Sequence, residues 1–237
     1  MSIANSISRL TEYYWRHGLA ATLRRAGVAG KRALFAGRMV VFYCDLNDRR
    51  LPQVNIPKAL NVKRVQVPTE LSTEHFQAIT GFWNRKLASQ NIRERFEKGA
   101  SLWLVECEGQ LAGYSWTIRG RAIAAYYFPI AKDDVQLFDF YVFPKFRGRT
   151  ILWFLVVYIL QTMRAEGAVR VFGDVAEWNE PSLSFYKMTP FRVLGLVSTY
   201  KIFGQVLTCW AANEPADGKQ KGAARRDRAT KALRSNE

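Results

Sequence analysis

The feature that most constrains the fold is an uninterrupted apolar run of ten residues, Ile151–Leu160. A helix that spans a bilayer needs roughly 20 such residues, so this run predicts a helix buried inside a globular domain. The aromatic segment Val135–Phe143 precedes it and predicts a strand, which Pro144 ends because proline cannot continue a central ladder. We expect the helix to run from about Arg147 to Glu166.

Strand-like and helix-like segments alternate along the rest of the chain. Strands are predicted at Met39–Asp45, Val62–Val67, Ser101–Cys107, Leu111–Ile118, Val169–Val175 and, as a pair, within Phe191–Trp210. Helices are predicted at Ser72–Arg85, Ile92–Lys98 and Asn179–Met188, with Ser72 as an N-cap. This order, without an internal repeat, predicts a mixed α/β (α+β) fold in which helices flank a central mixed sheet.

The ends of the chain differ in composition from its middle. Residues 1–38 carry seven basic residues and one acidic residue, and Tyr14, Trp15, Leu19 and Leu23 recur at helical spacing. We therefore expect a basic amphipathic helix in residues 1–37, which either packs on the domain or contacts a membrane surface or anionic partner. Residues 38–210 are expected to form the domain, and residues 211–237 a basic disordered tail.

Several classes of protein are excluded by residue usage. The three cysteines have no close spacing and the chain has two histidines, so neither a disulfide scaffold nor a cysteine- or histidine-based metal site is expected. The first ten residues lack a secretory signal pattern. We expect a cytoplasmic protein, with peripheral membrane association through residues 1–38 as the open alternative.

The formal charge of +15 favours an anionic partner. Nucleic acid is disfavoured, because the aromatic runs Ala124–Phe128 and Leu137–Phe143 are more typical of core strands than of exposed stacking surfaces.

The predicted turn before the apolar helix contains Arg147, Gly148 and Arg149. Free N–H groups at a helix start bind anions, and guanidinium groups add paired donors for phosphate oxygens. The turn therefore predicts an anion site, the alternative being an ordinary turn with solvated arginines.

Two motifs in this half of the chain resemble those of the GNAT N-acetyltransferase superfamily. Val142, Pro144 and Arg147 match the pattern Val-x-Pro-x-x-Arg/Gln-x-x-Gly-x-Gly/Ala, and Asn179 and Tyr186 keep the seven-residue spacing of a second motif. The resemblance covers about residues 60–210. Thr150 and Leu152 stand where the family has glycines, which puts the affinity for coenzyme A in question more than the fold.

The resemblance implies an N-acyltransferase, most simply an acetyltransferase, in which a primary amine directly attacks the thioester of acetyl-CoA or another acyl-CoA. No metal is implied. The implied cofactor-binding residues are Phe140, Tyr141 and Val142 beside the pantetheine arm, Arg147, Gly148, Arg149, Thr150, Ile151, Leu152 and Trp153 around the pyrophosphate, and Asn179.

By the same resemblance, Tyr186 is the general acid that protonates the thiolate. The base is Asp174, Asp139 or a water relay; Asp139 alternates with Phe138 and Phe140 and is predicted to face away from them.

The acceptor is not fixed by the sequence. A protein N-terminus, a lysine, an amino sugar and a small metabolite all fit, and the basic ends favour an anionic acceptor. The alternative function is a non-catalytic scaffold that binds a membrane or partner through its N-terminal helix, which Thr150 and Leu152 motivate.

Overall fold

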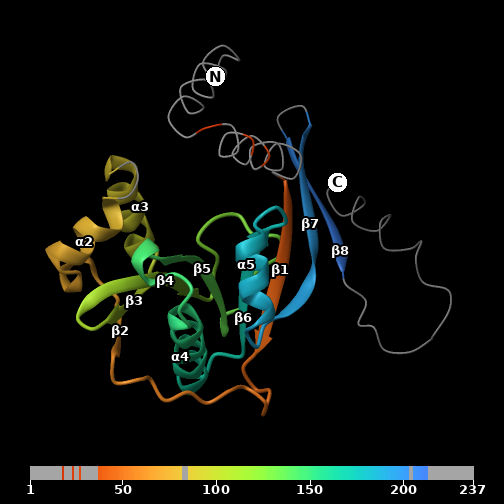
Figure 1. The fold of residues 1–237 in the computed structure, drawn as a ribbon. Coiled ribbons are helices and arrows are strands. Elements are labelled where there is room, and N and C mark those ends of the chain that lie inside the picture. Colours follow the sequence, from red (N-terminus) through yellow and green to blue (C-terminus); the bar gives the residue numbers. More distant parts are fainter. Residues whose placement is uncertain are drawn as a thin grey trace.

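The computed structural model describes Gly18, Leu23 and Gly27 and the ranges 37–81, 85–202 and 205–212 (Figure 1). The strands are β1 Arg38–Asp45, β2 Leu60–Val65, β3 Ser101–Cys107, β4 Gln110–Arg119, β5 Asp134–Val142, β6 Arg170–Ala176, β7 Arg192–Ile202 and β8 Gln205–Ala212. The helices are α2 Thr73–Thr80, α3 Arg85–Glu97, α4 Ile151–Ala165 and α5 Glu180–Lys187, with short 3-10 turns at Pro68–Glu70 and Pro144–Phe146.

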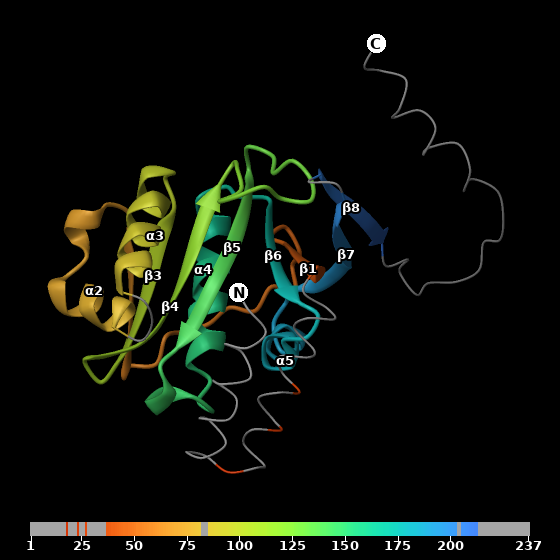
Figure 2. The ribbon, with the colours of Figure 1, turned by 90° about the horizontal axis from the view of Figure 1, so that it is seen from above.

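The strands form one mixed sheet with the order β2-β3-β4-β5-β6-β1-β7-β8. Figure 2 shows this order from β3 to β8. Neighbouring strands are antiparallel except β5 and β6, which are parallel. Helices flank this sheet, which confirms the predicted fold class. The strand β1 lies between β6 and β7, and the sequence alone did not predict this position.

The parallel pair of β5 and β6 is joined over only part of its length. Pairing runs from Asp134↔Arg170 to Gln136↔Phe172 and then stops, although both strands continue. Residues 137–142 of β5 and 173–176 of β6 therefore form an opening in the sheet, which we call the fork. Main-chain N–H and C=O groups that face this opening form no hydrogen bonds between these two strands.

The two faces of the sheet carry separate hydrophobic cores. One core includes Leu137, Val171 and Val175 and packs against buried residues of α4, such as Leu155 and Ile159. We call this the α4 face; α5 also packs on it through Tyr186. The other core includes Trp116 and packs against Ile92 and Phe96 of α3, which defines the α3 face.

Several predicted boundaries were wrong. The helix expected over Ser72–Arg85 ends at Thr80, and the next helix begins at Arg85 rather than Ile92. The helix expected from Arg147 begins at Ile151, because Gly148 has a φ of +77°, which a right-handed helix does not accept. The Ala124–Phe128 run, expected as a core strand, lies in the connection between β4 and β5.

The predictions for the chain ends mostly fall on residues that the structure does not describe. Apart from Gly18, Leu23, Gly27 and Gly37, the predicted N-terminal helix in residues 1–37 lies outside the described residues, as do residues 213–237 of the predicted tail. At the tail's predicted start, Ala211 and Ala212 instead pair with β7 as part of β8. Among the described helices, none has the length and apolar character needed to cross a bilayer.

Candidate functional site

The turn from β5 into α4 is fixed by one buried aromatic residue. Phe146 is buried within the 3-10 turn, whose N–H groups bond back to the preceding residues: Phe146 to the carbonyl of Phe143 at 2.9 Å and Arg147 to that of Pro144 at 3.3 Å. Gly148 then adopts the left-handed conformation, and α4 starts three residues later. The chain thus presents residues 147–150 at the surface, directly before the helix.

This turn has the electrostatic character of an anion site. The first hydrogen bond of α4 runs from the Phe154 N–H to the Thr150 carbonyl at 3.1 Å, so the preceding N–H groups have no partner within the helix. The first turn of α4 contains no acidic residue. Arg147 and Arg149 are exposed, and neither pairs with a carboxylate in the described part of the chain. Positive charge therefore accumulates here without internal compensation.

A pocket of about 470 Å³ lies at this helix start, within the size range of small-molecule sites. Seven of the predicted cofactor-binding residues line it: Val142, Arg147, Gly148, Arg149, Thr150, Leu152 and Trp153. The other wall comes from α5 and the residue after it, with Pro181, Phe185 and Met188. Sequence reasoning missed these three, although their i, i+4, i+7 spacing marks one face of a helix.

Four predicted cofactor-binding residues do not line this pocket. The side chain of Ile151 is buried in the core, and the Tyr141 ring stacks on Tyr114 on the α3 face. Phe140 packs against Phe185 and Tyr186. Asn179 precedes α5, and its side chain makes no capping hydrogen bond.

Leu152, one of the two residues that replace family glycines, lies in the pocket wall. It is half-buried and packs against the α4-face core. The pocket of about 470 Å³ is present with this side chain in place, and the effect of Leu152 on coenzyme A affinity stays a prediction.

Tyr186 is fully buried beside the fork. Its ring stacks on Phe42 at 4.2 Å and contacts Phe191 and Phe140. Among the described residues its hydroxyl has no hydrogen-bond partner, and it lies where a Cβ of Gly173 would be. Burial raises the pKa of Tyr186 well above its usual value, so the hydroxyl stays protonated.

Asp174 follows Gly173 in β6 and faces the opposite side of the sheet from Val175, which packs in the α4-face core. Its Oδ2 accepts a hydrogen bond from the Tyr127 hydroxyl at 3.1 Å. Burial raises the pKa of Asp174, and the side chains of Tyr127 and Gln136 oppose the rise. A carboxyl group with a raised pKa is a stronger base than an ordinary one.

Asp139 does not follow the strand alternation predicted for it. Its φ of +53° marks a bulge, and three steps on β5 oppose two on β4 between the pairs Trp116↔Phe138 and Tyr114↔Tyr141. The carboxylate pairs with Arg95 of α3 at 2.5 Å, and the same guanidinium lies over the Phe138 ring. Asp139 thus shares the α3 face with Phe138 instead of facing away from it.

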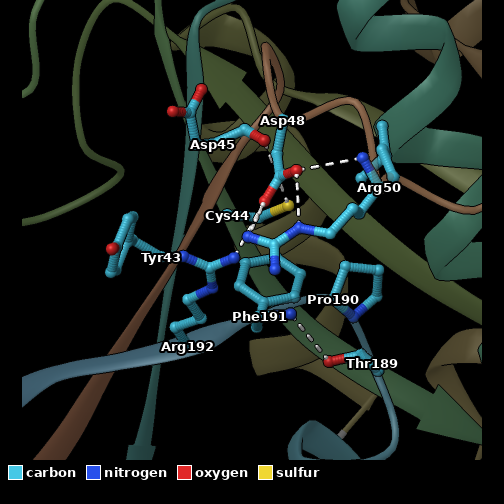
Figure 3. A pocket seen from close by; sticks show the side chains of 10 residues that line it. Tyr43, Cys44, Asp45, Asp48, Arg50, Thr189, Pro190, Phe191 and Arg192 are labelled. Carbon is cyan, nitrogen blue, oxygen red and sulfur yellow. Dashed lines mark hydrogen bonds and ion pairs between the residues drawn. The ribbon is translucent and has the colours of Figure 1, made fainter. Parts of the chain in front are cut away.

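A second pocket, of about 320 Å³, lies where β1 ends and β7 begins (Figure 3). Asp48 accepts hydrogen bonds from both Arg50 and Arg192, so the charges in this pocket are mutually compensated. Burial, and to a smaller extent the nearby negative charge of Asp45, raises the pKa of the Cys44 thiol to about 12. The thiol is therefore unreactive at neutral pH.

Within the described ranges, no group of three or more histidine, cysteine, aspartate or glutamate side chains is arranged to hold a metal ion.

Comparison with known proteins identifies the family. The model of the acetyltransferase (GNAT) family matches residues 68–189, which is just over half of the chain and runs from the start of the α3-face helices to the end of α5. The chain belongs to the GNAT acetyltransferase family.

Relatives of this GNAT protein include uncharacterized N-acetyltransferases of Mycobacterium bovis and Mycobacterium tuberculosis. Each is 26% identical over 129 residues, which cover 54% of this chain and 74% of the relative.

Similar solved structures include the GCN5-related N-acetyltransferases of Sphaerobacter thermophilus (17% identity, TM-score 0.47) and Kribbella flavida (15% identity, TM-score 0.43). They are matched over 66% and 75% of this chain, and the chain spans 48% and 60% of theirs.

Proposed function

We propose that this GNAT protein is an acyl-CoA-dependent N-acyltransferase, most simply an acetyltransferase, that modifies a primary amine. The observation that carries the proposal is the pocket at the start of α4, with its uncompensated arginines and an apolar wall from α5. Phe185 lines this pocket, and its ring contacts that of Tyr186.

The pocket fits the diphosphate and pantetheine portions of coenzyme A. The first N–H groups of α4, together with Arg147 and Arg149, would bind the diphosphate oxygens. Pro181, Phe185 and Met188 would contact apolar atoms, and the fork would receive the thioester end. Thr150 contributes no capping bond to α4, so its hydroxyl is available to a ligand.

In this proposal, the proton acceptor and the proton donor lie on opposite faces of the fork. On the α3 face, Asp174 would accept one proton from the neutral amine as its nitrogen forms a bond to the thioester carbonyl carbon. On the α4 face, Tyr186 would donate its proton as the carbon–sulfur bond breaks, which gives the amide and a free thiol. Gly173, without a side chain, lies between the two groups.

The experiment is incubation of the full chain with acetyl-CoA and a library of primary amines, scored by release of free thiol. Tyr186→Phe is expected to lower kcat by about a hundredfold, because the thiolate loses its proton donor. Tyr158→Phe is the matched control, since this α4 residue packs on Trp103 of β3, which is not one of the two strands of the fork. Unchanged turnover in Tyr186→Phe would contradict the assigned acid, and no thiol release with any amine would contradict the proposed reaction.

The library also separates the open acceptor classes. Amines that carry a phosphate or carboxylate group are expected to react faster than neutral ones, because the chain carries a net charge of +15. Raising the salt concentration is expected to reduce this preference.

A further inference from the structure

The connection between β4 and β5 places three consecutive aromatic residues, Tyr126, Tyr127 and Phe128, over the α3 face of β6. Phe128 anchors this segment with edge contacts to Phe172 at 5.0 Å and to Trp210 of β8 at 5.8 Å. A connection without regular structure is thus held by aromatic packing on two strands, and its two tyrosines are fixed in place beside Asp174.

A buried glutamine contacts the same segment. Gln136 is 4% exposed, and its Oε1 accepts a hydrogen bond from the Ile123 N–H at 2.9 Å. This bond ties the β4–β5 connection to β5, and the Gln136 side chain also lowers the pKa of Asp174. The Tyr127 hydroxyl donates directly to the Asp174 carboxylate.

The Tyr126 hydroxyl is the unexplained group in this arrangement. The oxygen is buried and has no hydrogen-bond partner among the described residues. Burial raises the pKa of Tyr126, with smaller contributions from Asp174, Tyr127 and Tyr186, so the hydroxyl is protonated. The Tyr126 ring packs against that of Tyr127 at 4.8 Å, and the Tyr127 hydroxyl bonds to Asp174. A buried hydroxyl without a partner is costly, and a ligand bound in the fork would remove that cost.

We propose that Tyr126 and Tyr127 form the amine-acceptor end of the active site, with Tyr127 as a positioning residue that orients the Asp174 carboxylate and Tyr126 as a hydrogen-bonding contact to the incoming amine. This inference rests on the proposed function, since it assigns the acceptor to the α3 face of the fork. The ligand class is a primary amine, which binds in its neutral form and gives one proton to the Asp174 carboxylate as its nitrogen bonds to the carbonyl carbon.

The sign of the expected pH effect follows from the groups that face Asp174. These are Tyr126 and Tyr127 from the β4–β5 connection, Gln136 from β5 and Tyr186 from α5; the paired residue of β1 is Val41, which does not titrate. A hydrogen bond to the ionised carboxylate lowers its pKa. Removing the Tyr127 hydroxyl therefore raises the pKa of Asp174 further. In a plot of kcat/KM against pH, the fall in rate on the acid side is then expected to begin at a higher pH.

The first test needs no acceptor. The full chain is labelled with ¹³C at the aspartate carboxyl groups and titrated by NMR, with the Asp174 signal assigned by its loss in Asp174→Asn. Tyr127→Phe is expected to move the Asp174 midpoint upward, whereas Tyr126→Phe and the control Tyr158→Phe leave it in place. An unmoved midpoint in Tyr127→Phe would overturn the inference.

The second test uses the best amine from the library and follows kcat/KM against pH. Tyr127→Phe is expected to shift the acid limb in parallel with the NMR midpoint, and Tyr126→Phe to lower kcat/KM for the amine about tenfold without shifting the limb. If Tyr127→Phe moves the NMR midpoint but not the acid limb of kcat/KM, Asp174 is rejected as the base and the inference is overturned. An unchanged kcat/KM in Tyr126→Phe would also overturn it. Failure of the proposed function would show separately, as absence of thiol release in the unaltered chain.

Discussion

At the scale of single residues, Gly173 limits what the candidate site can contain. A Cβ at this position would collide with the Tyr186 hydroxyl and approach the Leu137 carbonyl to 3.3 Å. The absence of a side chain thus lets the tyrosine hydroxyl reach the fork between β5 and β6.

Gly173→Ala is expected to destabilise the fold by about 2 kcal/mol, because a methyl group is forced into a packed site. The cost should fall when Tyr186→Phe is added, since the colliding oxygen is then absent. Urea unfolding of the two single variants and the double variant measures this coupling. Strictly additive changes in the free energy of unfolding would show that the hydroxyl does not lie against Gly173.

The sequence predicted these residues unevenly. The roles of Tyr186, Asn179 and Asp174 were implied by the resemblance to the GNAT family, in which the first two keep the spacing of the second motif, and these roles stay predictions. Tyr127 could not be predicted, because its bond to Asp174 joins residues 47 positions apart and depends on how an irregular connection folds back. Asp139 was misplaced because a bulge breaks the two-residue period on which the prediction relied.

At the scale of elements, the start of α4 combines an apolar helix with a turn that is held by the buried Phe146. The apolar run predicted the helix itself. Its first residue was mispredicted because sequence periodicity does not report the left-handed backbone at Gly148. The α5 wall of the pocket was also missed, because it comes from a segment that lies beyond the next strand in the chain.

Arg147→Met and Arg149→Met are each expected to weaken acetyl-CoA binding about tenfold, because each removes a charge-assisted contact to the diphosphate. Lys145→Met is the matched control, since this lysine is bonded to Gln110. Isothermal titration of the full chain measures the three dissociation constants. If the unaltered chain does not bind at millimolar acetyl-CoA, a non-catalytic scaffold is favoured instead.

At the scale of the whole molecule, the sheet consists of two halves that meet at a short parallel seam. Strands β2 to β5 form one half and β6, β1, β7 and β8 the other, and only three residue pairs join them along the seam. A bidentate ion pair closes its outer end: Arg170 donates to both oxygens of the buried Asp134, at 2.9 and 2.8 Å. This strand order was not predictable from the sequence, because the type of each strand does not specify its neighbours.

Arg170→Met is expected to lower the free energy of unfolding by about 3 kcal/mol, because it leaves the buried Asp134 carboxylate without its charged partner. Arg192→Met removes a mostly exposed partner of Asp48 and is expected to cost less than about 1 kcal/mol. Urea unfolding compares the two variants. Equal losses would show that the seam pair is no more important than a surface pair.

The location of β1 has a consequence for synthesis on the ribosome. This strand is made early, yet its two neighbours in the sheet, β6 and β7, are made only after most of the domain has been translated. The nascent chain therefore leaves Val41 and Phe42 without their strand partners until the last third of the polypeptide emerges.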